Sequence, residues 1–149
     1  MFFLSLSLHE KRTMIKRIVK DLILTDYSRR KVIVLLGARQ VGKTTLLAEL
    51  QEGKGKILSL NCDNVDDVLL LEGRTSTELK YLLSPYELVF IDEAQRVKNI
   101  GLTLKMIGDL KLETQVVVTG SSSLDMADEI NEPATGRLIE YNLFPFSLP

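Results

Sequence analysis

Residues 37–44 have the residue types and the spacing of a loop that binds phosphate. They read GARQVGKT, which is a glycine, four residues, a second glycine, a lysine and a hydroxyl residue. The glycines permit a tight turn whose backbone amides converge on phosphate oxygens, and a helix that begins there adds partial positive charge. In this pattern Lys43 reaches the β and γ phosphates, and the Thr44 hydroxyl binds Mg²⁺. The loop therefore predicts a site for the phosphate chain of a nucleotide.

The sequence on either side of this loop supports the prediction. A β-branched apolar run precedes it at 32–36, and a stretch compatible with a helix follows at 43–51. A strand, the loop and a helix are the setting that such a loop requires. An ordinary glycine-rich turn with a surface lysine is the alternative interpretation. The residues expected to bind the nucleotide are Gly37, Gln40, Val41, Gly42, Lys43, Thr44 and Thr45.

Two carboxylates follow another buried strand pattern. Asp92 and Glu93 come directly after the four apolar residues 88–91. Ligands bind at the carboxyl ends of strands in open α/β sheets, so this pair and the phosphate loop are expected at one edge of the sheet. Asp92 would hold Mg²⁺ through water, and Glu93 would act as general base toward the attacking water. A solvated loop is the alternative interpretation, and the phosphate loop counts against it.

Two further residues have weaker signals. Thr119 ends the apolar run 116–118, so its hydroxyl could contact the attacking water or the γ-phosphate, while a plain strand-ending turn is an equal alternative. Arg137 opens the last strand pattern and could stabilise phosphate charge in this subunit or in a neighbour. A surface or structural arginine is the alternative for Arg137.

Five short strand patterns alternate with helical ones along the chain. This alternation predicts a three-layer α/β fold with a mainly parallel sheet. An amphipathic helix is expected from Met14, because apolar residues recur there at three- and four-residue spacing. The strands are expected at residues 32–36, 56–60, 88–91, 115–119 and 137–144, and a loop at 121–136.

Two helices carry signals for where they begin. Thr75 and Glu78 have the spacing of a capping box for a helix that ends before Pro85. Asn99 is expected to cap a helix over residues 100–111. The apolar stripe of that helix is expected to contain Ile100, Leu104 and Ile107, widened by Leu102, Met106 and Leu110.

Length and composition limit the class of protein. The 149 residues are 45% hydrophobic and 26% charged, which fits one water-soluble domain and excludes disordered and collagen-like chains. One cysteine, Cys62, and one histidine, His9, exclude an internal disulfide and a Cys/His zinc cluster. Residues 1–13 are interpreted as a leader, a start-site artefact or a tail, without the features of an export signal. The single cysteine indicates a reducing compartment, so a cytoplasmic protein is expected.

Charge is divided unevenly along the chain, although the net charge is only −1. Residues 1–56 contain twelve Lys and Arg against five Asp and Glu, whereas residues 57–149 contain seven against fifteen. Much of the basic surplus falls on the polar face of the first expected helix and in the phosphate loop. Because the net charge of the whole chain is close to zero, a basic surface for nucleic acid over the whole chain is not expected.

Four ordered segments resemble a known family. The segments GARQVGKTTLL, LVFIDEAQRV, VVVTGSSS and GRLIEYNLFPFSL are similar to those of the N-terminal ATPase domain of a prokaryotic group of AAA+ superfamily ATPases. The resemblance extends from about Met14 to the end of the chain. It implies a Walker A motif at 37–44, a Walker B motif at Asp92 with catalytic Glu93, and a sensor-type residue at Thr119. It also implies a RecA-like sheet with the strand order 5-1-4-3-2.

The same resemblance implies ATP and Mg²⁺ as cofactors and ATP hydrolysis coupled to a conformational task. It also implies that residues 14–149 are the ATPase core of a longer protein. The helical lid is not part of this core, and the C-terminal domain would be its partner. If a neighbouring copy supplied the arginine, the protein would have to be a homo-oligomer. Two alternatives stay open, a nucleic-acid-stimulated motor and a nucleotide-gated interaction module with negligible turnover. No partner in a membrane is expected.

Overall fold

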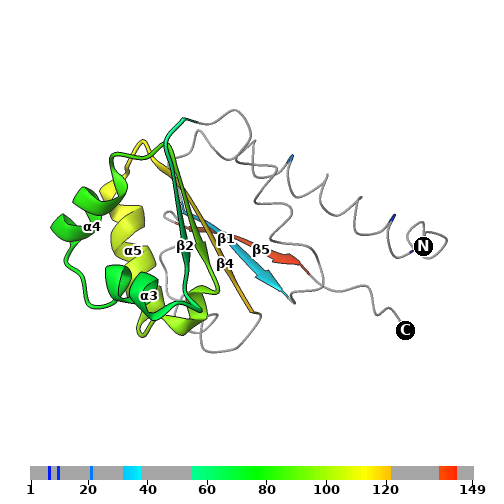
Figure 1. Cartoon of the computed structure of the whole chain (residues 1–149). Coiled ribbons are helices and arrows are strands. Elements are labelled where there is room, and N and C mark those ends of the chain that lie inside the picture. The colour runs from blue at the N-terminus through cyan, green and yellow to red at the C-terminus, as the bar shows by residue number, and fades with distance from the viewer. Residues whose placement is uncertain are drawn as a thin grey trace.

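The computed structural model describes residues 7, 10, 21, 32–37, 55–121 and 138–143, and these form a mixed α/β fold (Figure 1). Strands alternate with helices along most of this part of the chain. The elements in chain order are β1 (Val32–Gly37), β2 (Ile57–Asn61), α3 (Val65–Leu71), α4 (Ser76–Leu83), β3 (Leu88–Asp92), the 3₁₀ helix η4 (Ala94–Arg96), α5 (Ile100–Leu110), β4 (Gln115–Gly120) and β5 (Leu138–Leu143).

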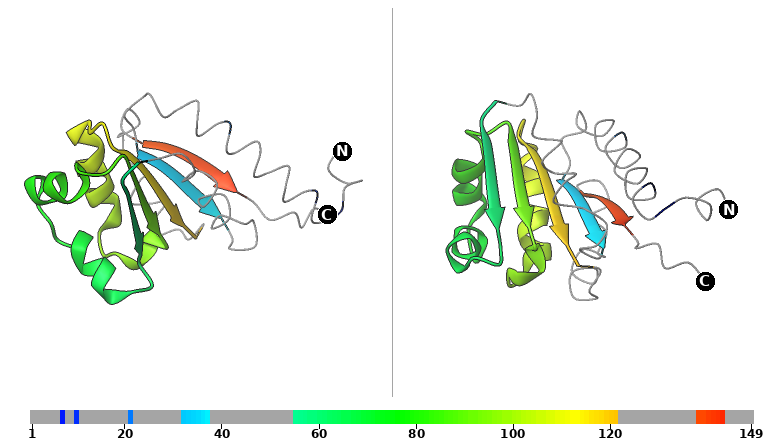
Figure 2. Two further views of the ribbon diagram at one scale, coloured as in Figure 1. Left: turned by 45° about the horizontal axis from the view of Figure 1, so that its top comes forward. Right: turned by 45° about the vertical axis from the view of Figure 1, so that its right-hand side comes forward.

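All five strands form one parallel sheet in the order β2-β3-β4-β1-β5 (Figure 2). This is the predicted order 5-1-4-3-2 counted from the other side, and β4 separates β1 from β3. Because every strand runs the same way, all the carboxyl ends lie along one edge of the sheet, and all the amino ends lie along the opposite edge. We call these the carboxyl edge and the amino edge.

The three central strands are buried along nearly their whole length. Every residue of β1 and β4 is buried, and β3 is buried from Leu88 to Ile91. Such strands need apolar side chains on both faces, which is why they appear in the sequence as continuous β-branched runs without alternation. The predicted strands agree with the observed ones to within one residue at every end.

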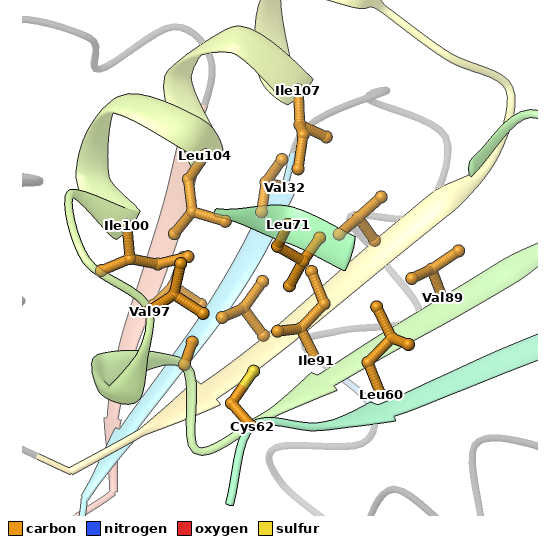
Figure 3. Close-up of a cluster of buried hydrophobic side chains, with 14 of the residues drawn as sticks. Val32, Leu60, Cys62, Leu71, Val89, Ile91, Val97, Ile100, Leu104 and Ile107 are labelled. Carbon is orange, nitrogen blue, oxygen red and sulfur yellow. The ribbon is translucent and has the colours of Figure 1, made fainter. Parts of the chain in front are cut away.

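Helices α3, α4 and α5 cover one face of the sheet (Figures 1 and 2). Their buried side chains pack with alternate residues of the strands into one apolar cluster (Figure 3). In that cluster Leu71 of α3 and Leu104 of α5 meet Val32, Val89 and other strand residues. In β1 and β4, and in β3 from Leu88 to Ile91, the residues between these are also buried and, by the alternation of a strand, point to the other face.

The predicted capping box of α4 is confirmed. The Thr75 hydroxyl accepts from the Glu78 backbone N–H at 3.2 Å, and the Glu78 carboxylate accepts from the Thr75 backbone N–H at 3.1 Å. The prediction for α5 was partly wrong. This helix begins at Ile100 as expected, but Asn99 has a φ of 57° and its side chain makes no capping bond. The side chain of Leu102 is 58% exposed, so it does not widen the buried stripe.

Two elements were not predicted, α3 and η4. Helix α3 begins at Val65 and is capped by Asn64, whose side chain accepts from the Asp66 N–H at 3.1 Å. The sequence does contain a capping residue, Asn64. The helix was still missed because it is short and its apolar residues Val65 and Leu69 are exposed, so its apolar residues do not mark one buried face.

Several predicted elements lie outside the described residues, including the helix at 43–51 and most of the loop at 121–136. Glu10 and Asp21 are helical, and Ser7 and Glu10 exchange two hydrogen bonds of 2.9 and 3.1 Å in the pattern of a capping box. In the part of the chain that is described, no helix has the length and apolar character needed to span a bilayer.

Candidate active site

Three of the residues expected at strand ends lie on the carboxyl edge. Asp92 ends β3, Thr119 is the last residue but one of β4, and Gly37 ends β1. The register pairs Ile91 with Val118, which places Asp92 beside Thr119. The sequence prediction that these strand ends share one edge is therefore confirmed by the parallel sheet.

The Thr119 hydroxyl joins the two acidic residues. It donates a hydrogen bond to Asp92 Oδ1 and accepts one from the backbone N–H of Glu93 at 3.2 Å. The side chain is fully buried, with 0% of its surface exposed. A hydroxyl has one proton to donate and two lone pairs to accept with, so one oxygen can hold both neighbours. Thr119 thus fixes the carboxylate of Asp92 and the backbone of Glu93.

Glu93 is held in an unusual backbone conformation. Its φ and ψ are 55° and 45°, in the left-handed region that costs an ordinary L-residue about 1 to 2 kcal/mol. Only 7% of the residue is exposed. Strain of this kind persists where the surrounding structure imposes it, and it concentrates at functional sites. The left-handed turn at Glu93 directs the chain from the end of β3 into η4.

A glutamine in η4 contacts the Glu93 carboxylate. Gln95 Nε2 donates to Glu93 Oε2 at 2.6 Å, and Gln95 Oε1 accepts from the backbone N–H of Ser121 at 3.2 Å. Asp92, Glu93, Thr119, Gln95 and Ser121 therefore form one hydrogen-bonded group across the ends of β3 and β4. We call these five residues the carboxylate network.

The first glycine of the predicted phosphate loop, Gly37, has a φ of 155°. This conformation is largely restricted to glycine, because a Cβ atom would clash with the backbone. The rest of the predicted nucleotide-binding set, residues 40–45, lies outside the described residues, as does Arg137. Their placement stays a prediction.

The sequence around the carboxylate network matches a known family. A family model described as the AAA domain covers residues 29–149. The chain belongs to the AAA domain family. It is an AAA-type P-loop NTPase domain, which confirms the resemblance drawn from four segments of the sequence.

One solved structure that resembles this AAA domain is the crystal structure of a DNA replication initiation factor. The two are 14% identical in sequence with a TM-score of 0.48. The match covers 83% of this chain and 45% of that chain, so this chain spans less than half the length of that protein. A search of curated proteins found no match.

Electrostatics at the carboxyl edge of this AAA domain are negative, as Cys62 shows. Burial is the largest cause that raises the pKa of the Cys62 thiol, and with the carboxylates of Asp67, Asp92, Asp63 and Glu93 it brings this pKa to about 12. The thiol therefore stays protonated at neutral pH and cannot act as a nucleophile. Cys62 also touches the site directly, since its backbone N–H donates to the Asp92 carbonyl oxygen at 2.9 Å.

The donors of this AAA domain fit a magnesium ion that is shared with a ligand. Mg²⁺ takes one or two protein carboxylates and completes its octahedron with water and substrate phosphates. Asp92 is half-buried at the sheet edge and offers one such carboxylate. Within the described ranges, no group of three His, Cys, Asp or Glu side chains could hold a metal ion by itself.

Sequence reasoning missed the parts of the site that depend on contacts between strands. It identified Asp92, Glu93 and Thr119 by type and position, but not the left-handed turn at Glu93 or the part played by Gln95. Gln95 is only two residues after Glu93, and this spacing brings the two side chains together only because the chain turns into η4.

Proposed function

We propose that this AAA domain binds ATP with Mg²⁺ and hydrolyses it to ADP and phosphate. The observation that carries the proposal is the Thr119 hydroxyl joined to both Asp92 and Glu93, on the edge where β1 ends in Gly37. Membership of the AAA domain family supports nucleotide binding in general. The proposal goes further in assigning ATP, Mg²⁺ and turnover to named residues.

The roles divide between the two motifs. Asp92 would hold Mg²⁺ together with Thr44, and Lys43 would contact the β and γ phosphates. Mg²⁺, when bound, would neutralise charge on the phosphate oxygens. Arg137 would add positive charge near the γ-phosphate, from this chain or from a second copy. The backbone of the loop would bind phosphate oxygens at Gly37, Gln40, Val41, Gly42 and Thr45.

Glu93 would supply the base for hydrolysis. Its carboxylate takes a proton from water as the water oxygen forms a bond to the γ-phosphorus and the bond to the ADP oxygen breaks. Thr119 holds the Glu93 backbone, so the base keeps its place relative to Asp92. Preorganisation of this kind lowers the barrier because the site does not have to rearrange during the reaction.

The test is a titration with Mg-ATP followed by steady-state turnover. We expect Lys43→Ala to weaken ATP binding by at least about tenfold, whereas Lys80→Ala, a lysine exposed on α4, should leave it unchanged. Glu93→Gln should keep ATP binding and lose turnover by about 10² to 10⁴-fold. Absence of ATP binding by the unmodified chain, or equal binding by Lys43→Ala, would disprove the proposal.

The same assay separates the two functions left open by the sequence. Turnover that rises with DNA or RNA, and that falls steeply with salt, would identify a nucleic-acid-stimulated motor. Tight ATP binding with negligible turnover under every condition would identify a nucleotide-gated interaction module. We propose a cytoplasmic location and assembly with further copies or with a C-terminal domain, both of which can be examined in the cell and by mass measurement in solution.

A further inference from the structure

The side chain of Gln95 bridges the Glu93 carboxylate and the end of β4. Its Nε2 donates to Glu93 Oε2 at 2.6 Å, and its Oε1 accepts from the Ser121 N–H at 3.2 Å. A primary amide is among the few neutral groups that donate to a carboxylate and accept from an N–H with the same side chain. We propose that Gln95 is a positioning residue that orients Glu93 as the base and links this orientation to the end of β4. This inference rests on the proposed ATP hydrolysis.

A base placed like Glu93 needs such a partner. The Glu93 side chain has several rotatable bonds, and its backbone is already confined to a left-handed turn. The 2.6 Å bond from Gln95 is charge-assisted, which makes it shorter and stronger than a bond between neutral groups. A reacting group displaced by about 1 Å can lose about a hundredfold in rate, so the bond acts on kcat rather than on nucleotide affinity.

Glu93 is fixed from β4 at two points. Thr119 accepts from its backbone N–H, and Ser121, two residues later, binds the amide that holds its carboxylate. A displacement of this short stretch would shift the backbone and the side chain of the base together. Gln95 therefore makes the orientation of Glu93 sensitive to the position of the end of β4.

Gln95→Met tests the positioning role because methionine is unbranched like glutamine but lacks both hydrogen bonds. We expect kcat to fall by about tenfold to a hundredfold while the dissociation constant for ATP changes less than about twofold. Gln95→Glu should also lower kcat, since it keeps the acceptor for Ser121 but sets a carboxylate against Glu93. The matched control is Arg96→Met on the same turn, which removes only an exposed ion pair of 3.4 Å to Asp63 and should leave kcat unchanged.

A double substitution separates positioning from a general structural effect. In the Glu93→Gln background, Gln95→Met should cause no further loss of residual turnover, because the carboxylate through which it acts is gone. A kcat for Gln95→Met within about twofold of the unmodified chain, or an equal loss in both backgrounds, would overturn the inference.

The contact can be read without turnover. The side-chain amide signal of Gln95 in a ¹⁵N NMR spectrum should move when Glu93 is replaced by Gln, and should stay in place in Arg96→Met. A Gln95 signal that ignores the Glu93 substitution would overturn the positioning role whatever the activity. If the Gln95 signal responds to the Glu93 substitution but the unmodified chain does not hydrolyse ATP, the proposed function is overturned and Gln95 still holds the Glu93 carboxylate.

Discussion

The two edges of the sheet use buried polar side chains in different ways. At the amino edge, the Thr114 hydroxyl lies 3.1 Å from the Leu83 carbonyl oxygen and 2.7 Å from that of Tyr86. Gln115, at the start of β4, donates through Nε2 to the Val116 carbonyl oxygen at 3.2 Å. These side chains satisfy backbone carbonyls where loops meet strands, which is the usual requirement of a buried polar group.

At the carboxyl edge, the bonds converge on two carboxylates. Thr119 contacts Asp92 and the backbone of Glu93, and Gln95 contacts the Glu93 carboxylate. Placing a buried and a half-buried acidic group so close together costs free energy that packing alone would not require. The comparison teaches that one sheet separates the two tasks. Polar groups of the amino edge bind backbone carbonyls, and those of the carboxyl edge bind the two carboxylates to which we assign roles in the proposed reaction.

The largest effect on kcat is expected from replacing Glu93, whose backbone has a left-handed conformation at the carboxyl edge. Glu93→Ala and Glu93→Gly should both lose about 10² to 10⁴-fold in kcat. Glu93→Gly should be more stable than Glu93→Ala by about 1 kcal/mol, because glycine relieves the strain at a φ of 55°. Urea denaturation and steady-state turnover measure the two effects.

Lys111 provides the control near the amino edge. It is also left-handed, with a φ of 47°, and it ends α5 before the chain enters β4. Lys111→Gly should raise stability by about 0.5 to 1 kcal/mol with no change in kcat. If Lys111→Gly lowered kcat as Glu93→Gly does, the separation of the two edges would be wrong.

The contrast between the edges was only partly predictable from the sequence. Strand positions and order followed from apolar runs, and Asp92 and Thr119 could be placed because parallel strands end together. Asn99 and Leu102 were misjudged, because sequence spacing does not show that the chain enters α5 through a left-handed residue. The bonds of Gln95 to Ser121 and of Glu93 to Thr119 join residues 26 apart, so no local pattern reports them.

Cys62 offers a native probe of charge at the carboxyl edge. Its pKa is raised from 9.0 to about 12, first by burial and next by Asp67, so the folded chain holds about a thousandfold less thiolate at about pH 8 than an unfolded one. Reaction with a chromogenic disulfide should be slower in the native protein by about that factor. Because folding raises this pKa, the stability that Cys62 contributes is present below about pH 9 and is lost as pH rises toward 12.

Single neutralised carboxylates should sharpen that result. Asp67→Asn keeps an acceptor for the Asn61 N–H, now bound at 2.9 Å, and should lower the pKa of Cys62 and speed its modification. Glu87→Gln, at the amino edge, should leave the rate unchanged. Equal acceleration by both variants would mean that the thiol reports opening of the fold rather than charge at one edge.

A smaller effect is expected from removing one hydroxyl at each edge. Thr119→Val should reduce kcat by about tenfold or more, with ATP binding retained, because Asp92 and the Glu93 backbone lose their common partner. Thr114→Val should lower stability by about 1 to 3 kcal/mol, because the single hydroxyl proton shared between the Leu83 and Tyr86 carbonyl oxygens is lost from a buried position. Turnover per folded molecule of Thr114→Val should match that of the unmodified chain. If Thr114→Val lowered kcat and Thr119→Val lowered only stability, the roles assigned to the two edges would be wrong.

The smallest effect is expected from Glu78 in α4, which belongs to neither edge of the sheet. The pKa of Glu78 is held below 4.5 by the Thr75 backbone N–H, and also by Arg74 at 3.1 Å and by the Thr75 hydroxyl. Because folding lowers this pKa, the carboxylate stabilises the fold above about pH 4.5, and this contribution is lost as pH falls through the lower value of the folded state. Glu78→Gln should therefore lower the urea midpoint slightly at pH 7, and the difference should close as pH falls below the lowered pKa of the folded state. The loss is small because glutamine still accepts in a capping box and the ion pair is exposed to water. A change in kcat for Glu78→Gln would connect α4 to the carboxylate network, which the bonds of Glu78 to Thr75 and Arg74 give no reason to expect.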